Sequence, residues 1–313
     1  MKNCILGLTN TRKLTLLATM ALMLSVTALS ASPAMAAPKG EYAVFADCPL
    51  SHAELVGCIA ARTEKGKIII GKRTVPLEHT ITLQGGIEEE TPCEFPFAGK
   101  GECRSPFVGA ADGNTLSKTA QNVPGGLTNL INCKAIKNEL LRHTCEFFFE
   151  HGITAVTATT ELALPASSIG LSQPALAEPI LSEAFGIPAL SLPVKVKLDN
   201  PLFGKECYIG SAAEPITLNL ITGKTNPPAP NKPISGQVGE ISSRAEGGIL
   251  VISNNSLVDN SFKAPGTNGC GFFGLLDPLL NAALGVPSEA GHNTAILEGT
   301  LEQTNAALAK EHE

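Results

Sequence analysis

The residue types that most often do chemistry are spread along this chain without a catalytic spacing. No two histidines are four residues apart, as two zinc ligands on one helix face would be, and neither HExxH nor CxxC occurs. A GxSxG nucleophile elbow and the phosphate loops GxxxxGKS and GxxxxGKT are also absent. The pattern predicts no catalytic residue, no cofactor site and no metal site. The six histidines are His52, His79, His143, His151, His292 and His312.

Acidic and amide side chains gather in two segments that raise the question of calcium. Residues 87–94 contain four glutamates, and residues 254–260 contain amide oxygens together with Asp259. Calcium takes about six to eight oxygens around one point, and a run of neighbouring carboxylates does not produce that arrangement. Both segments are therefore predicted to be solvated loops.

Eight of the nine cysteines lie beyond Cys4, and an even number favours disulfides in an exported chain. The short spacing of Cys48 and Cys58 predicts a local pair. The same spacing predicts a pair between Cys93 and Cys103, and four cysteines stay unassigned. The eight candidates are Cys48, Cys58, Cys93, Cys103, Cys133, Cys145, Cys207 and Cys270.

The first 36 residues have the composition of a secretory signal peptide. Lys2, Arg12 and Lys13 precede an apolar run at residues 14–29, and residues 34–36 form a small-x-small cleavage site. The run of 16 residues is shorter than the roughly 20 that span a bilayer. The protein is therefore predicted to be secreted to the extracellular space or cell surface, with no transmembrane segment after signal removal.

The mature chain is predicted to be acidic. Removal of the signal takes away three basic residues and no acidic one, so 20 Lys and Arg remain against 29 Asp and Glu and the net charge is −9. An acidic chain repels phosphate backbones, which excludes nucleic acid as a partner. The absence of Trp and the presence of only two Tyr disfavour a glycan-binding surface and an aromatic protein-docking anchor.

Most of the mature chain alternates between apolar and polar residues, as half-buried antiparallel strands do. The clearest case is LPVKVKL at residues 192–198, in which valine and leucine alternate with lysine. ITLNL at residues 216–220 has the same period. Further strand candidates are residues 66–70, 79–83, 153–162, 248–253 and 294–301.

Two Leu-rich segments are predicted to be short helices that pack on the β core. Residues 130–142 place apolar side chains on one helical face and basic ones on the other. Residues 278–284 follow Asp277, the predicted N-cap, and end before Gly285. If the first helix ran unbroken from Cys133 to Cys145, the two would lie about 18 Å apart. A disulfide between Cys133 and Cys145 therefore requires the helix to end early. If the helix does not end early, both cysteines pair with other cysteines.

Two segments of the chain repeat one pattern. Residues 114–125 read NTLSKTAQNVPG and residues 255–266 read NSLVDNSFKAPG, so Asn, Leu, Pro and Gly coincide at an offset of 141. Each is followed by a Leu-rich helix candidate and a Thr-rich strand candidate. The shared order predicts an internal duplication of two halves of about 100 residues.

Together these patterns predict a mostly β fold, an antiparallel β-sandwich or barrel with two short helices. The predicted parts are the signal peptide at residues 1–36, a first β-rich half at 37–165, a connecting segment at 166–193 and a second β-rich half at 194–313. Two separate domains and one pseudo-symmetric unit both fit this division.

Several longer motifs carry a resemblance to a known family. They are FADCPL (residues 45–50), TVPLEHTITLQGG (74–86), AADGNTLSKTAQNVPGG (110–126), TTELALPASSIGL (159–171), LSLPVKVKLDNP (190–201), PPAPNKPISG (227–236) and NTAILEGTLEQTNAA (293–307). With these motifs the mature chain resembles a family of secreted actinobacterial proteins that has no assigned function. The resemblance implies export and no particular ligand or catalytic residue.

The expected function is that of a secreted, non-enzymatic β-rich protein associated with the cell envelope, the cell surface or further copies of itself. Export, disulfides and missing active-site motifs motivate this expectation. An extracellular carrier of a small apolar ligand is the alternative, because a duplicated β fold can enclose a cavity. A hydrolase whose residues meet only in three dimensions is the third reading.

Overall fold

The computed structural model describes residues 37–89, 104–129, 137–140, 142–143, 146 and 154–313. The strands are β1 (Leu55–Ile70), β2 (Arg73–Pro76), β3 (Ile81–Glu88), β4 (Ser105–Gly109), β5 (Ala120–Asn122), β6 (Thr157–Leu162), β7 (Gly170–Leu171), β8 (Leu190–Asp199), β9 (Tyr208–Ile209), β10 (Ile216–Leu220), β11 (Glu240–Arg244), β12 (Ile249–Asp259), β13 (Thr267–Asn268) and β14 (Thr294–Asn305). Ten of these strands of the described chain pair in one order from β11 to β5, and β2, β9, β10 and β13 pair off that path. The sheet is not closed into a barrel, and the predicted mostly β, antiparallel class is confirmed.

The helices are short and lie between the strands. The α-helices of the described residues are α2 (Gln173–Ala177), α3 (Pro179–Phe185), α4 (Asp277–Leu284) and α5 (Ala306–Glu311). The 3-10 helices are η1 (Gly40–Phe45), η2 (Gly126–Asn129), η4 (Ala166–Ser168), η5 (Ala245–Gly247) and η6 (Phe272–Gly274). No helix in the described part of the chain is long and apolar enough to span a bilayer.

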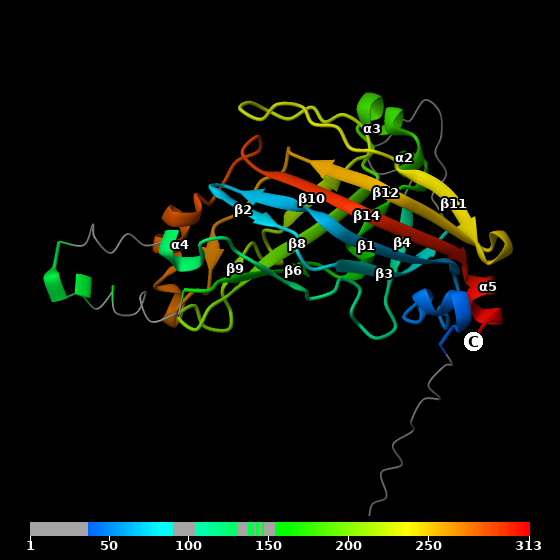
Figure 1. Cartoon of the computed structure of the whole chain (residues 1–313), viewed down its shortest axis with the longest axis horizontal. Coiled ribbons are helices and arrows are strands. Elements are labelled where there is room, and N and C mark those ends of the chain that lie inside the picture. Colours follow the sequence, from blue (N-terminus) through cyan, green and yellow to red (C-terminus); the bar gives the residue numbers. More distant parts are fainter. Residues whose placement is uncertain (1–36, 90–103, 130–136, 141, 144–145, 147–153) are drawn as a thin grey trace, which may run out of the picture. The chain divides into compact units, whose positions relative to one another are not determined.

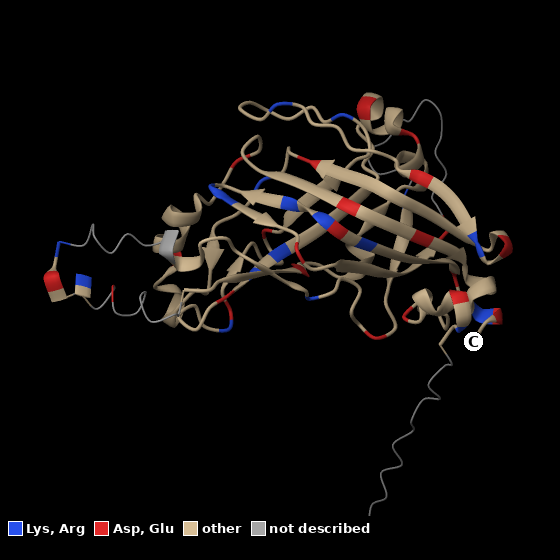
Figure 2. Ribbon diagram, in the orientation of Figure 1, with Lys and Arg blue, Asp and Glu red and all other residues tan. Residues whose placement is uncertain are grey.

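The strands form two layers that enclose the main core. One layer contains β11, β12, β14, β1, β2 and β3, and the other contains β5 to β10 with β13. Strand β4 pairs with β3 of the first layer and with β7 of the second, so it joins them. In Figure 1, β8 and β6 run behind β1 and β14, and Figure 2 shows both charge signs interspersed along the strands.

Strands β8 and β10 have the alternation that their sequences predict. In β8, Val194, Val196 and Leu198 are buried, while the lysines between them are partly exposed. In β10, the apolar residues are buried and Thr217 and Asn219 are exposed. The buried faces of both strands belong to the main core.

Strand β1 is longer than the predicted segment 66–70. Its first half was not predicted, because it is buried on both faces. Ile59 belongs to the main core between the layers. Cys58 and Ala60, which point to the opposite face, pack in a second cluster with Tyr42 and Phe45 of η1. A strand buried on both faces reads as a continuous apolar run, so the period-two pattern is lost there.

The helix predictions have mixed outcomes. Helix α4 is confirmed, and Gly285 ends it in the left-handed conformation. Asp277 is the first helical residue, and Leu276 occupies the N-cap position in place of the predicted Asp277. The helix predicted at residues 130–142 lies mostly outside the described residues. Helices α2, α3 and α5 were not predicted, because five to seven residues are too few to establish a helical period.

The two predicted halves interleave and share both layers. Strand β1 has β2 and β3 along one edge and β14, from the other half, along the opposite edge. Strand β8 has β9 and β10 along one edge. Along the other edge it has β6, from the first half, and β7, from the predicted connecting segment. Strands of both predicted halves therefore lie in each layer, and the internal duplication stays a prediction.

The two repeated segments differ in local structure, because residues 255–259 belong to β12 while residues 114–119 lie outside the strands. Leu116 bridges Leu83 of β3 before the chain enters β5, which pairs with β6. Val258 of β12 bridges Ile221, just past β10, and β12 pairs with β14. The predicted connecting segment 166–193 contributes β7, α2 and α3 to the fold. The predicted boundary at residue 193 also falls inside β8.

Leu220→Ala is expected to lower the free energy of unfolding by about 2–5 kcal/mol, because it leaves a cavity in the core. Leu220 is fully buried in β10, and Thr217 on the same strand is exposed. Thr217→Ala is the matched control and is expected to change stability little. Urea unfolding followed by circular dichroism measures both, and equal effects would contradict the assigned facing of β10.

Candidate functional site

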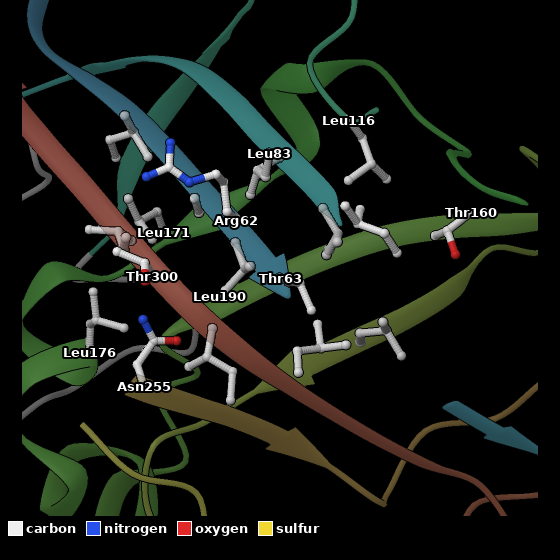
Figure 3. Close-up of a pocket in the computed structure, with 18 of the residues that line it drawn as sticks. Arg62, Thr63, Leu83, Leu116, Thr160, Leu171, Leu176, Leu190, Asn255 and Thr300 are labelled. Carbon is white, nitrogen blue, oxygen red and sulfur yellow. The ribbon is translucent and has the colours of Figure 1, made fainter. Parts of the chain in front are cut away.

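A small apolar cavity lies between the two layers. It has a volume of about 70 Å³ and is lined by leucines and isoleucines from both layers. Figure 3 shows Leu83, Leu171 and Leu190 around it, with Arg62 and Asn255 at its margin. A second cavity of about 50 Å³ adjoins it, and Ile68 and Thr160 line both.

The size of these cavities limits what they can hold. Sites for typical small-molecule ligands enclose roughly 300–1,000 Å³. A cavity of about 70 Å³ accepts only a very small molecule unless the layers separate. The interior therefore gives the carrier reading little geometric support.

The predicted disulfides are confirmed in part. Cys48 and Cys58 are bonded, as their spacing predicts. Cys207 is bonded to Cys270 across 63 residues, a pair that spacing alone did not assign. The remaining candidates, Cys93, Cys103, Cys133 and Cys145, lie outside the described residues.

Four exposed large apolar side chains lie in and next to η6. Phe272, Phe273 and Leu275 are 75%, 89% and 74% exposed, and Leu279 of α4 is 43% exposed. The two phenylalanine rings contact each other edge to face, with centroids 4.2 Å apart. We call these four side chains the apolar tip. Contiguous exposed apolar side chains mark interaction surfaces more often than isolated ones do.

The backbone of the apolar tip is held in an unfavourable conformation. Phe273 has φ +52° and ψ +33°, in the left-handed region that bulky residues avoid. Gly271 and Gly274 on either side also have positive φ. A Cβ at Gly271 would lie 2.6 Å from Cγ of Leu276, so this position requires glycine. Such strain persists only where the surrounding structure fixes it.

Several interactions fix the base of the apolar tip. The Cys207–Cys270 disulfide ties it to the loop after β8. The backbone N–H of Gly271 donates to the carbonyl of Phe203 at 2.7 Å. The Asp277 carboxylate accepts hydrogen bonds from the N–H groups of Gly269 and Cys270, at 3.1 and 3.0 Å. The side chains are therefore exposed on a constrained turn.

Residues 269–274 read GCGFFG, which has the letters of the GxGxxG dinucleotide turn ahead of helix α4. The structural context differs from that turn. The segment follows β13, a two-residue strand in an antiparallel layer, and its second residue is the disulfide-bonded Cys270. The glycines here shape the apolar tip, and the segment lacks the parallel βαβ unit of a nucleotide site.

A buried ionic network lies on the outer face of the first layer. The Glu302 carboxylate of β14 accepts hydrogen bonds from Arg62 at 2.6 Å and from Arg244. Arg244 also donates to the carbonyl of Glu41. The network links β1, β14 and β11 to η1. Every carboxylate oxygen of Glu302 has a cationic partner, so the network is structural and leaves no free nucleophile or base.

The prediction that residues 254–260 form a solvated loop is wrong, because most of them belong to β12 and this segment contains a buried carboxylate. Asp259 is 4% exposed and lines a polar recess of about 300 Å³ between α3 and β12. Its two oxygens accept from the N–H groups of Asn219 and Ser261 at 2.7 and 2.8 Å. Burial raises the pKa of this carboxyl above its ordinary value, and the two N–H donors oppose that shift. Asp259 belongs to no cluster of three metal-ligating groups within the described residues.

Two histidines have contacts that the sequence did not indicate. His312 stacks on Tyr42 with ring centroids 4.0 Å apart. His52 lies 2.8 Å from the Glu88 carboxylate, 36 residues away. His151 lies outside the described residues, and the exposed His143 has its Nδ1 3.5 Å from the carboxylate of Glu146.

No family model, curated protein or solved structure matches the chain. The function is therefore inferred from the geometry described above. Its most distinctive feature is the apolar tip, which sequence reasoning missed because apolar residues are expected to be buried. The flanking glycines of GCGFFG were the signal that could have indicated an unusual turn.

The difference in stability between the wild type and Asp259→Asn is expected to depend on pH. A carboxyl with a raised folded pKa stabilises the fold fully below its unfolded pKa of about 3.9 and loses that contribution as pH rises through the folded pKa. The wild type should therefore gain stability relative to Asp259→Asn as pH falls from 7 toward that range.

Urea unfolding of both proteins at a series of pH values measures this difference. The hydrogen bond lost in Asp259→Asn changes the difference in stability by an amount that does not depend on pH. The other titrating groups contribute equally to both proteins. A stability difference that does not change with pH, or that changes in the opposite direction, would contradict the raised pKa of Asp259.

Proposed function

We propose that the protein is exported and attaches to a lipid surface of the cell envelope through the apolar tip. The observation that carries this proposal is the exposure of Phe272 and Phe273 on a turn that the Cys207–Cys270 disulfide constrains. Two adjacent aromatic rings with no buried partner are unfavourable in water. Insertion into the acyl boundary of a bilayer removes them from water.

The charge pattern around the apolar tip favours lipid over a charged partner. Between Lys263 and Glu289 the only charged residue is Asp277. Its carboxylate is occupied by two backbone N–H groups at the base of the tip. Figure 2 shows the segment around α4 almost free of charged residues. Lys72, from the turn between β1 and β2, is a charged neighbour of this segment and donates to the carbonyl of Ala282 in α4. Insertion limited to the four side chains of the apolar tip therefore removes few charges from water.

The apolar tip is a small wedge. With about 200 Å² for each large side chain, the exposed fractions give an apolar area of roughly 550 Å². Insertion of such a wedge into lipid needs no further surface, whereas a second copy of the chain must also cover polar surface around the tip to reach the total of about 800 Å² that a stable interface buries on each partner.

Export is supported by the composition of the first 36 residues and by the two disulfides. Disulfides persist in the oxidising space outside the cell, where an envelope surface is within reach. The resemblance to secreted actinobacterial proteins agrees with this placement. The carrier function is the second candidate, and it requires the layers to open beyond the cavity of about 70 Å³.

The double variant Phe272→Ser and Phe273→Ser is expected to lower binding to lipid vesicles by at least about tenfold. Burial of each phenylalanine contributes roughly 1.5–3 kcal/mol, and about 1.4 kcal/mol is one factor of ten. Co-sedimentation of the mature protein with phosphatidylcholine vesicles, with and without anionic lipid, measures the partition coefficient.

Ile241→Ser is the matched control, because Ile241 is 59% exposed on β11, away from the apolar tip. It is expected to bind vesicles as the wild type does. Equal loss in the control, or vesicle binding that survives the double variant, would overturn the proposal. A wild-type oligomer in sedimentation velocity that the double variant abolishes would instead assign the apolar tip to self-association.

Native mass spectrometry of the exported protein tests the carrier candidate. The small interior cavity predicts a bare native mass, equal to that of the disulfide-bonded chain. A mass increment present only under native conditions would show a bound molecule and support the carrier function over lipid attachment.

A further inference from the structure

We propose that His52, Glu54 and Glu88 form a binding site for a divalent transition metal of the zinc type. A ring nitrogen of His52 and one carboxylate oxygen each of Glu54 and Glu88 lie within 4.8 Å of one another. His52 Nε2 is 2.8 Å from Glu88 Oε1. Among the described residues, no other group of three such side chains converges in this way.

The fold brings these three residues together from two directions. The Cys48–Cys58 disulfide closes a short loop that carries His52 and Glu54. A turn in this loop is fixed by the hydrogen bond from the N–H of His52 to the carbonyl of Pro49, at 2.8 Å.

Strand β3 supplies the third ligand. Leu55, which follows Glu54, is paired with Glu88 at the end of the β1–β3 ladder. A register shift between Leu55 and Gly57 interrupts the ladder at the same place. The β1–β3 pairing and the disulfide together set the distance between the loop and Glu88.

The donor set indicates which metal class it suits. One imidazole nitrogen and two carboxylate oxygens are ligands that Zn²⁺ accepts, and a water completes four-coordination. Calcium takes about six to eight oxygens and is not favoured by an imidazole ligand. Two carboxylates also balance the charge of a divalent cation.

The distances require only a small adjustment on binding. Zinc lies about 2.0–2.2 Å from nitrogen and oxygen ligands, so ligand atoms around it are separated by roughly 3–3.5 Å. His52 and Glu88 are partly exposed, at 39% and 26% of their side chains, and can move by that amount. The metal would replace the direct contact between His52 and Glu88 and lie between the two carboxylates, which repel each other without a cation.

Isothermal titration of the mature, disulfide-bonded protein with Zn²⁺ tests the site. We expect one bound zinc per chain and a loss of affinity of about tenfold or more in each of His52→Ala, Glu54→Gln and Glu88→Gln. His79→Ala is the matched control, because His79 is exposed ahead of the same strand β3. The control is expected to bind zinc as the wild type does.

Two outcomes would overturn the proposal. One is the absence of zinc binding, which would leave His52 and Glu88 as an ordinary surface pair. The other is zinc binding that His52→Ala and Glu88→Gln leave unchanged, with circular dichroism confirming that both variants are folded. Zinc-edge X-ray absorption gives an independent readout, in which nitrogen and oxygen ligands support the site and sulfur ligands place the metal on a cysteine.

Discussion

The pairing of β1 with β14 is the interaction on which most of this structure depends. It runs from Gly57 with Asn305 to Ile69 with Thr294 and is the longest ladder of the fold. It brings the final strand of the second half against the first strand of the first half. In the other layer, β6 of the first half pairs in a similar way with β8 of the second half. Because each half completes the layer of the other, neither half has a core of its own.

The described surface features lie where this framework ends or turns. The apolar tip follows β13 and is tied by Cys207–Cys270 to the chain that leaves β8. The cluster of His52 with its two glutamates lies where the β1–β3 ladder begins. The interior between the layers is packed down to small cavities. The molecule thus combines small interior cavities with two constrained surface features, which are the basis of the proposed attachment to lipid and the proposed metal site.

Local patterns of the sequence predicted the elements that have one buried face. Val194, Val196 and Leu198 alternate with lysines in β8, so the period of two was visible. The first half of β1 was missed because Ile59 and Ala60 are buried on opposite faces. The site residues were missed for a different reason: the β1–β3 pairing brings His52 to Glu88 across 36 residues. The exposure of Phe272 and Phe273 was not predicted, since it depends on the turn and not on residue type.

The position of β14 near the end of the sequence has a consequence for the order of assembly. A chain that leaves the ribosome from its N-terminus makes β1 to β3 early, but the partner for the long edge of β1 comes last. Until then that edge presents unpaired N–H and C=O groups, which are prone to pair with other chains. The first layer therefore closes only after nearly the whole chain has been synthesised. Such a delay is compatible with the proposed export, in which the chain passes a narrow channel before it folds.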